Sequence, residues 1–130
     1  MAGRERVSAR TLAAMSKCYE RDNYTQTVLA NSALVPGELL LYGFTVFNNS
    51  GSAQNIQLFD SGSEVPADGA VPVANFPVAA GTELAVYYGE AGRLCKNGLS
   101  LANSSTASTK TIGSADCLFD IQYAHIFEED

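Results

Sequence analysis

The run from Leu39 to Phe47 is the longest apolar stretch of the chain, and the turn-forming sequence Asn48-Asn49-Ser50-Gly51 ends it. It is too short to cross a bilayer, because a membrane-spanning helix needs about 20 apolar residues. It is also rich in aromatic and β-branched residues, which favour strands over helices. The sequence therefore predicts a long central strand over residues 38–48.

A regular strand divides these side chains between two faces. One face is expected to carry Leu40, Tyr42, Phe44 and Val46. The other is expected to carry Leu39, Leu41, Thr45 and Phe47. Because both faces are apolar, we expect the second face to be covered as well, by the N-terminal segment or by another subunit.

Shorter segments of β-like composition account for most of the remaining chain. They cover residues 25–33, 54–60, 71–78, 82–88, 92–103 and 116–123. Gly, Pro, Asn, Asp and Ser residues separate them, and no helical pattern lies between them. This spacing predicts an all-β fold of about seven or eight strands, an antiparallel β-sandwich for which jelly-roll and immunoglobulin-like topologies fit equally well.

Three segments have residues that predict their local structure more specifically. Pro72 and Pro77 predict a sheet edge for residues 71–78, because proline cannot donate to a ladder. The Asn97-Gly98 dipeptide fits either a hairpin turn or a bulge. Residues 103–111 are of low complexity and predict an exposed loop.

Alternation in three segments also predicts which side chains share one face of a strand, and for the first segment that face is expected to point inward. These side chains are Ile56 and Leu58, then Leu84, Val86 and Tyr88, and finally Cys117, Phe119, Ile121 and Tyr123.

Charge divides the chain into an N-terminal arm, residues 1–24, and a β-sandwich domain, residues 25–130. Residues 1–21 hold five basic and two acidic side chains (5 − 2 = +3), and residues 22–130 hold three basic and twelve acidic ones (3 − 12 = −9). The arm is expected to be extended or partly helical, since Ser8 can cap a helix and Leu12, Met15 and Tyr19 fall at i, i+3 and i+7. Its charge suits docking on an acidic protein surface, and an ordinary solvated terminus is the alternative.

Composition excludes several classes of protein. An acidic domain argues against nucleic-acid binding, and 46% apolar residues with mean hydropathy near zero argue against a disordered or membrane-spanning chain. The absence of a signal-like apolar segment at the start predicts folding in a cytoplasm. Cys18, Cys95 and Cys117 lack metal-ligand spacing, so we expect reduced thiols, with the last two as small core residues.

No motif predicts an enzyme, a cofactor or a metal site. His125 is the sole histidine and is expected to be a surface or subunit-contact residue. The patterns Asn48-Asn49-Ser50 and Asn103-Ser104-Ser105 match glycosylation acceptors but are expected to be turns. Tyr88 and Arg93 are spaced so that a ring and a cation can meet, either as a link between subunits or as a local contact.

Several segments together resemble small β-domains encoded among the structural genes of tailed bacteriophages. They are residues 41–49, 65–73, 93–111 and 115–123, including the sequence Leu41-Tyr42-Gly43-Phe44-Thr45-Val46-Phe47. The resemblance covers roughly residues 25–123. It implies a virion protein, a capsid cement or decoration protein similar to those of short-tailed cyanophages. Such proteins sit on the outer surface of the major capsid protein shell as homotrimers, at three-fold and quasi-three-fold positions.

The resemblance assigns no contact residues, so the candidates come from charge alone. The basic side chains expected to contact the capsid are Arg4, Arg6, Arg10, Lys17, Arg21, Arg93 and Lys96. The alternative is an adhesion or adaptor module of a tail fibre, spike or neck, in which the loop of residues 103–111 touches a host receptor. A sugar-binding module or glycan-active enzyme is a third class.

Overall fold

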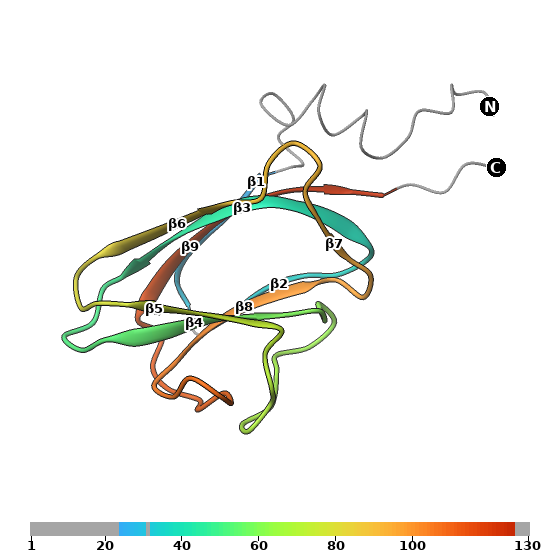
Figure 1. Ribbon diagram of the computed structural model, residues 1–130. Coiled ribbons are helices and arrows are strands. Elements are labelled where there is room, and N and C mark those ends of the chain that lie inside the picture. Colours follow the sequence, from blue (N-terminus) through green and yellow to red (C-terminus); the bar gives the residue numbers. More distant parts are fainter. Residues whose placement is uncertain (1–23, 31, 127–130) are drawn as a thin grey trace, which may run out of the picture.

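The computed structural model describes residues 24–30 and 32–126, and within them the chain forms strands and loops without a helix (Figure 1). The strands are β1 (Tyr24–Ala30), β2 (Ser32–Val35), β3 (Leu39–Asn48), β4 (Gln54–Phe59), β5 (Ala74–Val78), β6 (Glu83–Tyr87), β7 (Arg93–Cys95), β8 (Leu99–Ser104) and β9 (Cys117–His125). None of the described segments is a helix that could span a membrane. The predicted all-β class is confirmed.

The strands form two antiparallel sheets. The larger follows the order β1-β9-β3-β6, with β7 also paired to β3, and the smaller follows β2-β8-β4-β5. β3 is central as predicted, since β9 pairs along one edge while β6 and β7 share the other. The predicted edge position of the proline-containing segment is confirmed, because among the strands of the described residues β5 pairs with β4 alone.

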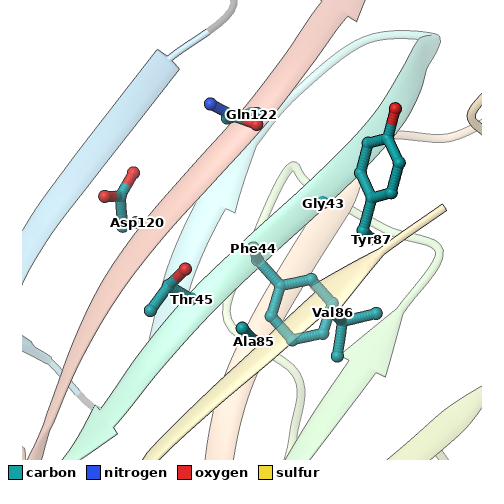
Figure 2. Close-up of a pocket in the computed structure, with 8 residues that line it drawn as sticks. All are labelled: Gly43, Phe44, Thr45, Ala85, Val86, Tyr87, Asp120 and Gln122. Carbon is teal, nitrogen blue, oxygen red and sulfur yellow. The ribbon is translucent and has the colours of Figure 1, made fainter. Parts of the chain in front are cut away.

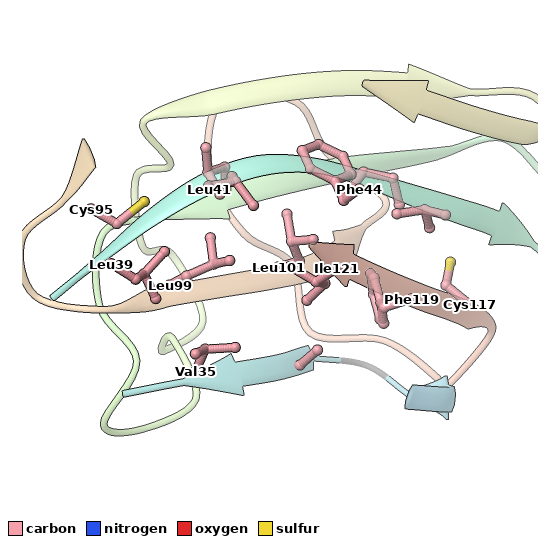
Figure 3. Close-up of a cluster of buried hydrophobic side chains, with 14 of the residues drawn as sticks. Val35, Leu39, Leu41, Phe44, Cys95, Leu99, Leu101, Cys117, Phe119 and Ile121 are labelled. Carbon is pink, nitrogen blue, oxygen red and sulfur yellow. The ribbon is translucent and has the colours of Figure 1, made fainter. Parts of the chain in front are cut away.

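One apolar core lies between the two sheets (Figure 3). Its fully buried members are Ala33, Val35, Leu39, Leu41, Phe44, Val46, Ile56, Leu58, Val78, Cys95, Leu99, Leu101, Cys117, Phe119 and Ile121. The inward positions predicted on β4 are confirmed. The side chains predicted to share one face near β6 and on β9 also do so, and that face is the core face, with Leu84, Val86, Tyr88 and Tyr123 packed against the core. Cys95 and Cys117 are 3% and 0% exposed and unbridged, as expected of small core residues.

A β-bulge at Tyr42 overturns the predicted division of faces on β3. Leu41 pairs with Tyr123 while Gly43 pairs with Gln122, so β3 holds one residue more than β9 between these pairs. An extra residue shifts the alternation of side chains by one position. Leu39 and Leu41 before the bulge therefore share the core face with Phe44 and Val46 after it.

The bulge places Leu40 and Tyr42 on the outer face of the larger sheet. There they form a second buried cluster with Ala124, and Ile126 packs against it. Gly92, in the loop between β6 and β7 that arches over β3 in Figure 1, is close enough that a Cβ on it would lie 3.2 Å from Tyr42 Cε1. This part of the second face is covered, but the residues described against it belong to the domain itself, whereas the sequence predicted cover by the N-terminal segment or by another subunit.

Two further expectations are wrong. The single strand predicted over residues 25–33 is two strands, since β1 pairs with β9 in the larger sheet and β2 with β8 in the smaller one. The Asn97-Gly98 dipeptide is neither a hairpin turn nor a bulge, because it connects β7 to β8, which lie in different sheets.

Candidate protein-binding surface

Lys110 is a buried lysine in the loop between β8 and β9. Its side chain is 1% exposed, and Nζ donates to the carbonyl oxygen of Pro66 at 2.8 Å and to Ser32 Oγ at 3.3 Å. Its backbone pairs with the same neighbouring loop, through Lys110 N to Ala70 O and Gly69 N to Lys110 O. The loop before β5 and the loop before β9 are thus held together as one unit.

Burial lowers the pKa of Lys110, because a charged ammonium is poorly solvated there. The carboxylate of Asp68 opposes this shift by its negative charge. Asp68 also accepts a hydrogen bond from Ile112 N at 3.0 Å, which adds a second link between the two loops.

Gln57 organises the other end of the loop before β9. Its side chain is fully buried, and Nε2 lies 2.8 Å from Thr106 O and 3.2 Å from both Ala107 O and Thr109 O. Ser104 Oγ accepts from Thr106 N and Thr111 N. The predicted exposed loop over residues 103–111 is therefore wrong at both ends, and only residues 105–108 are exposed.

Both glycosylation-like asparagines are closed to solvent, but only the first of them opens a turn as expected from the sequence. Asn48 ends β3 just before a turn, whereas Asn103 lies within β8, so the turn expected there is wrong. Asn48 is 0% exposed, and its Nδ2 donates to the carbonyl oxygens of Ser52, Val78 and Ala79 while its Oδ1 accepts from Ser50 N. Asn103 is 1% exposed and donates to Gln54 Oε1 and Ser114 O.

Three chain segments, around Val35, Gly62 and Gly98, lie in close contact. Gly98 has a φ of 103°, and a Cβ added to it would lie within 3 Å of the carbonyl oxygen of Val35 and of the backbone of Gly62. A Cβ added to Gly62 would likewise clash with the backbone of Val35. Gly62 N donates to Asn97 O at 3.1 Å, and Asn97 N donates to Asp60 Oδ1 at 3.0 Å. The start of the loop before β5 is therefore also held by contacts with the rest of the domain.

These fixed loops carry four of the large apolar side chains that the described residues leave exposed. They are Val65 at 51%, Val71 at 73%, Val73 at 52% and Ile112 at 53% exposure, and we call them the loop surface. Beside them lies a hollow of about 320 Å³ lined by Phe59, Ser61, Glu64, Val65, Pro66, Ala67 and Ala70. Exposed apolar side chains that form one patch mark surfaces that bind another protein, so these four residues are the candidate for such a surface.

A second depression, which we call the sheet groove, lies on the larger sheet away from the core (Figure 2). Its volume is about 260 Å³, and β3, β6 and β9 contribute the residues that line it. They are Gly43, Phe44, Thr45, Ala85, Val86, Tyr87, Asp120 and Gln122.

The structure places only two of the basic residues predicted to contact a partner. Arg93 lies on β7 with its guanidinium carbon 5.7 Å from the centre of the Tyr88 ring, so the expected contact between cation and ring forms within one chain. Lys96 is exposed in the turn after β7. Arg4, Arg6, Arg10, Lys17 and Arg21 lie outside the described residues, as do Cys18 and the rest of residues 1–23.

His125 contacts other residues of its own chain. Its Nε2 donates to Pro36 O at 2.9 Å, and its ring packs edge-on against Tyr123 at 5.3 Å between centres. Within residues 24–30 and 32–126, no three His, Cys, Asp or Glu side chains are grouped closely enough to hold a metal ion.

Comparison with models of protein families, with curated proteins and with solved structures finds no match. The candidate surfaces are therefore identified from the geometry of this chain alone. Sequence reasoning missed Lys110 and Gln57, and the only signal for Lys110 was a lysine isolated within a run of Ser, Thr and Ala.

Proposed function

We propose that this chain is a non-enzymatic structural protein of a virion, a capsid cement or decoration protein that binds the outer surface of the major capsid protein shell. The observation that carries the proposal is the loop surface, in which exposed valine and isoleucine side chains sit on loops fixed by Lys110 and Gln57. A surface that is already ordered loses little conformational entropy on binding, which suits a protein whose role is to hold others in place.

The proposed assembly is a homotrimer at three-fold and quasi-three-fold positions of the shell. A two-sheet sandwich of jelly-roll or immunoglobulin-like topology supplies the rigid body, and the basic arm, residues 1–24, extends the contact across the shell. Arg4, Arg6, Arg10, Lys17 and Arg21 on the arm, with Arg93 and Lys96 on the domain, are the proposed partners for acidic groups of the capsid. Several weak contacts repeated by symmetry then add up to tight binding.

The test is a binding assay with expanded shells that lack the protein, with bound copies counted by electron cryo-microscopy. We expect saturable occupancy at three-fold positions by the full chain and weaker occupancy after deletion of residues 1–21. Val71→Asp should lower the affinity about ten-fold, the effect of losing one well-packed apolar contact. Ala53→Asp adds the same charge at an exposed position outside the loop surface and should bind as the unmodified chain does.

Two outcomes contradict the proposal. Absence from the shell together with density at the tail vertex assigns the chain to a fibre, spike or neck, as an adhesion or adaptor module. A chain that binds shells with equal affinity after Val71→Asp does not use the loop surface.

A further inference from the structure

β6 is an edge strand of the larger sheet (Figure 1). Among the strands of residues 24–30 and 32–126, β3 alone pairs with it, along its whole length from Glu83 to Tyr87. The opposite edge of β6 therefore carries backbone groups that none of these strands takes up. Such an edge is a template on which another strand can pair.

A backbone bond just beyond the end of β6 shows which of its residues face β3. Tyr88 N donates to Tyr42 O at 2.7 Å. In an antiparallel pair, every second residue directs both its N–H and its C=O toward the neighbouring strand. Val86 and Leu84, two and four positions before Tyr88, therefore also bond to β3.

The residues between them face the open edge. The N–H and C=O groups of Glu83 and Ala85 point away from β3 by the same alternation. The other end of the ladder agrees with this assignment, because Asn48 N donates to Thr82 O at 2.9 Å and Thr82 is in step with the residues bonded to β3. Two neighbouring edge positions of β6 can thus donate to and accept from an added strand.

β6 lacks the features that discourage pairing at other edges of the fold. β5, at an edge of the smaller sheet, contains Pro77, and β1 has an irregular register between Thr27 and Ala30. Proline, bulges and lysine are common means of protecting an edge strand. β6 contains no proline, lysine or arginine, and its ladder with β3 is regular from end to end.

The side chains of β6 that face the core are incompletely covered. Leu84 and Val86 pack against the apolar core, yet both are only half-buried. A strand added beside β6 would extend the larger sheet and cover these two side chains further. Pairing at this edge would therefore bury apolar surface in addition to forming backbone bonds.

A second copy of β6 fits this edge. When two copies pair antiparallel about a two-fold axis at Leu84, Glu83 of each copy lies opposite Ala85 of the other, and each such pair exchanges both backbone bonds. The two Leu84 side chains meet across the axis on the core side. No like charges lie directly opposite each other, an arrangement that would weaken the pair. Two-fold contacts of this kind are the commonest among homo-oligomers.

We propose that two copies of the free protein pair antiparallel through β6, with Glu83 of each copy bonded to Ala85 of the other. The contact goes beyond the function proposed above, and it is separate from the three-fold assembly on the shell because it concerns the chain in solution. It uses the edge of the larger sheet and leaves the loop surface exposed. It therefore stands or fails independently of binding to shells.

The test is amide hydrogen exchange of the ¹⁵N-labelled full chain at a low and a high protein concentration. We expect the amides of Glu83 and Ala85 to exchange at least about five-fold more slowly at the higher concentration, because the second copy protects them. The amide of Val86 is bonded to β3 within each copy and should change much less. Sedimentation over the same range should give an average mass that rises from one chain toward two.

Variants at one position test the pairing and its register. Ala85→Pro removes the N–H that points away from β3 and keeps the ladder within the chain, so it should fold and stay monomeric. Ala85→Glu places a carboxylate opposite Glu83 of the other copy and should raise the dissociation constant about three-fold or more, whereas Ala85→Lys should lower it. Ala53→Glu adds the same charge at an exposed position outside β6 and should dimerise as the unmodified chain does.

Four results would overturn the proposal. A single chain at every concentration is the first, and self-association without slower exchange at Ala85 is the second, because the contact then lies elsewhere. The third is slow exchange of Ala85 at both concentrations, which assigns the edge to a segment of the same chain. The fourth is an equal effect of Ala85→Glu and Ala85→Lys. These two variants keep every backbone bond, so they decide the matter even where Ala85→Pro does not fold.

Discussion

The ammonium nitrogen of Lys110 lies 2.8 Å from the carbonyl oxygen of Pro66, 44 residues earlier in the chain. This bond joins two loops that have no strand pairing with each other. It also explains how a lysine can be almost fully buried, because its charge faces a carbonyl dipole and a hydroxyl.

Lys110→Met keeps the length of the side chain and removes the ammonium. We expect the free energy of unfolding to fall by about 1–3 kcal/mol at pH 7, since the half-buried carbonyl oxygen of Pro66 loses its donor. Chemical denaturation of the variant and the unmodified chain measures the difference. Lys96→Met, at an exposed position, is the matched control and should change stability by less than about 0.5 kcal/mol.

The unmodified chain and the Lys110→Met variant should also differ in how their stability depends on pH. The folded-state pKa of Lys110 is below its unfolded value, so between the two values the unfolded chain binds more protons and stability rises with pH. The stability difference between the unmodified chain and Lys110→Met should therefore widen as the pH rises toward 10.5. A constant difference across that range would show that Lys110 stays protonated in the folded protein.

Gly62→Ala should be strongly destabilising. The new methyl group would overlap the carbonyl group of Val35 and lie 2.9 Å from Leu99 N, and both obstacles are backbone atoms that cannot rotate away. We expect a loss of about 3 kcal/mol or more, or no folded protein at all. Gly51→Ala has no heavy atom within 4 Å of the added Cβ, and its melting temperature should stay within a few degrees of the unmodified chain.

Asn48→Asp should destabilise the fold in a way that acid partly reverses. The substitution replaces the Nδ2 donor with an oxygen facing the carbonyl oxygens of Ser52, Val78 and Ala79. The folded state then favours the protonated acid, which raises the pKa of the new carboxyl, and stability recovers as the pH falls through that value. Thermal melts between pH 4 and pH 8, with Asn49→Asp at the exposed neighbour as control, test this expectation.

The buried thiols should lower stability at high pH. Burial raises the pKa of both Cys95 and Cys117 from 9.0 to about 11, so between these values the folded state holds protons that the unfolded state has lost. Stability then falls with rising pH, by about 2–3 kcal/mol for each thiol over the whole window. Cys117→Ala should show a shallower decline between pH 9 and pH 11 than the unmodified chain, and an identical decline would contradict this account.

The sequence predicted most of the fold because alternation and turn residues are local signals. β3, β4, β6 and β9 lie close to their expected residues, and Pro77 is at a sheet edge. The bulge at Tyr42 could not be predicted, because it depends on the pairing of β3 with β9, and an apolar residue at every position from 39 to 42 hides the shift in alternation.

The candidate surfaces were harder to predict than the strands. Lys110 lies in a Ser/Thr-rich stretch typical of exposed loops, and its burial depends on Pro66 and Ser32, which are distant in sequence. The break between β1 and β2 near residue 31 could not be predicted for a similar reason. Both segments have the composition of a strand, and they differ only in the strand with which each one pairs. Local composition carries no information about such long-range partners.

The pairing of β1 with β9 also determines how the domain carries mechanical load. Pulling on the chain at Tyr24, along the strand axis, acts across the backbone hydrogen bonds of an antiparallel ladder that extends from Tyr24 opposite Gln122 to Ala30 opposite Cys117. The bonds are therefore sheared together instead of being opened one after another. Because β2 follows β1 after a single residue and belongs to the other sheet, force that passes Ala30 is shared by both halves of the sandwich.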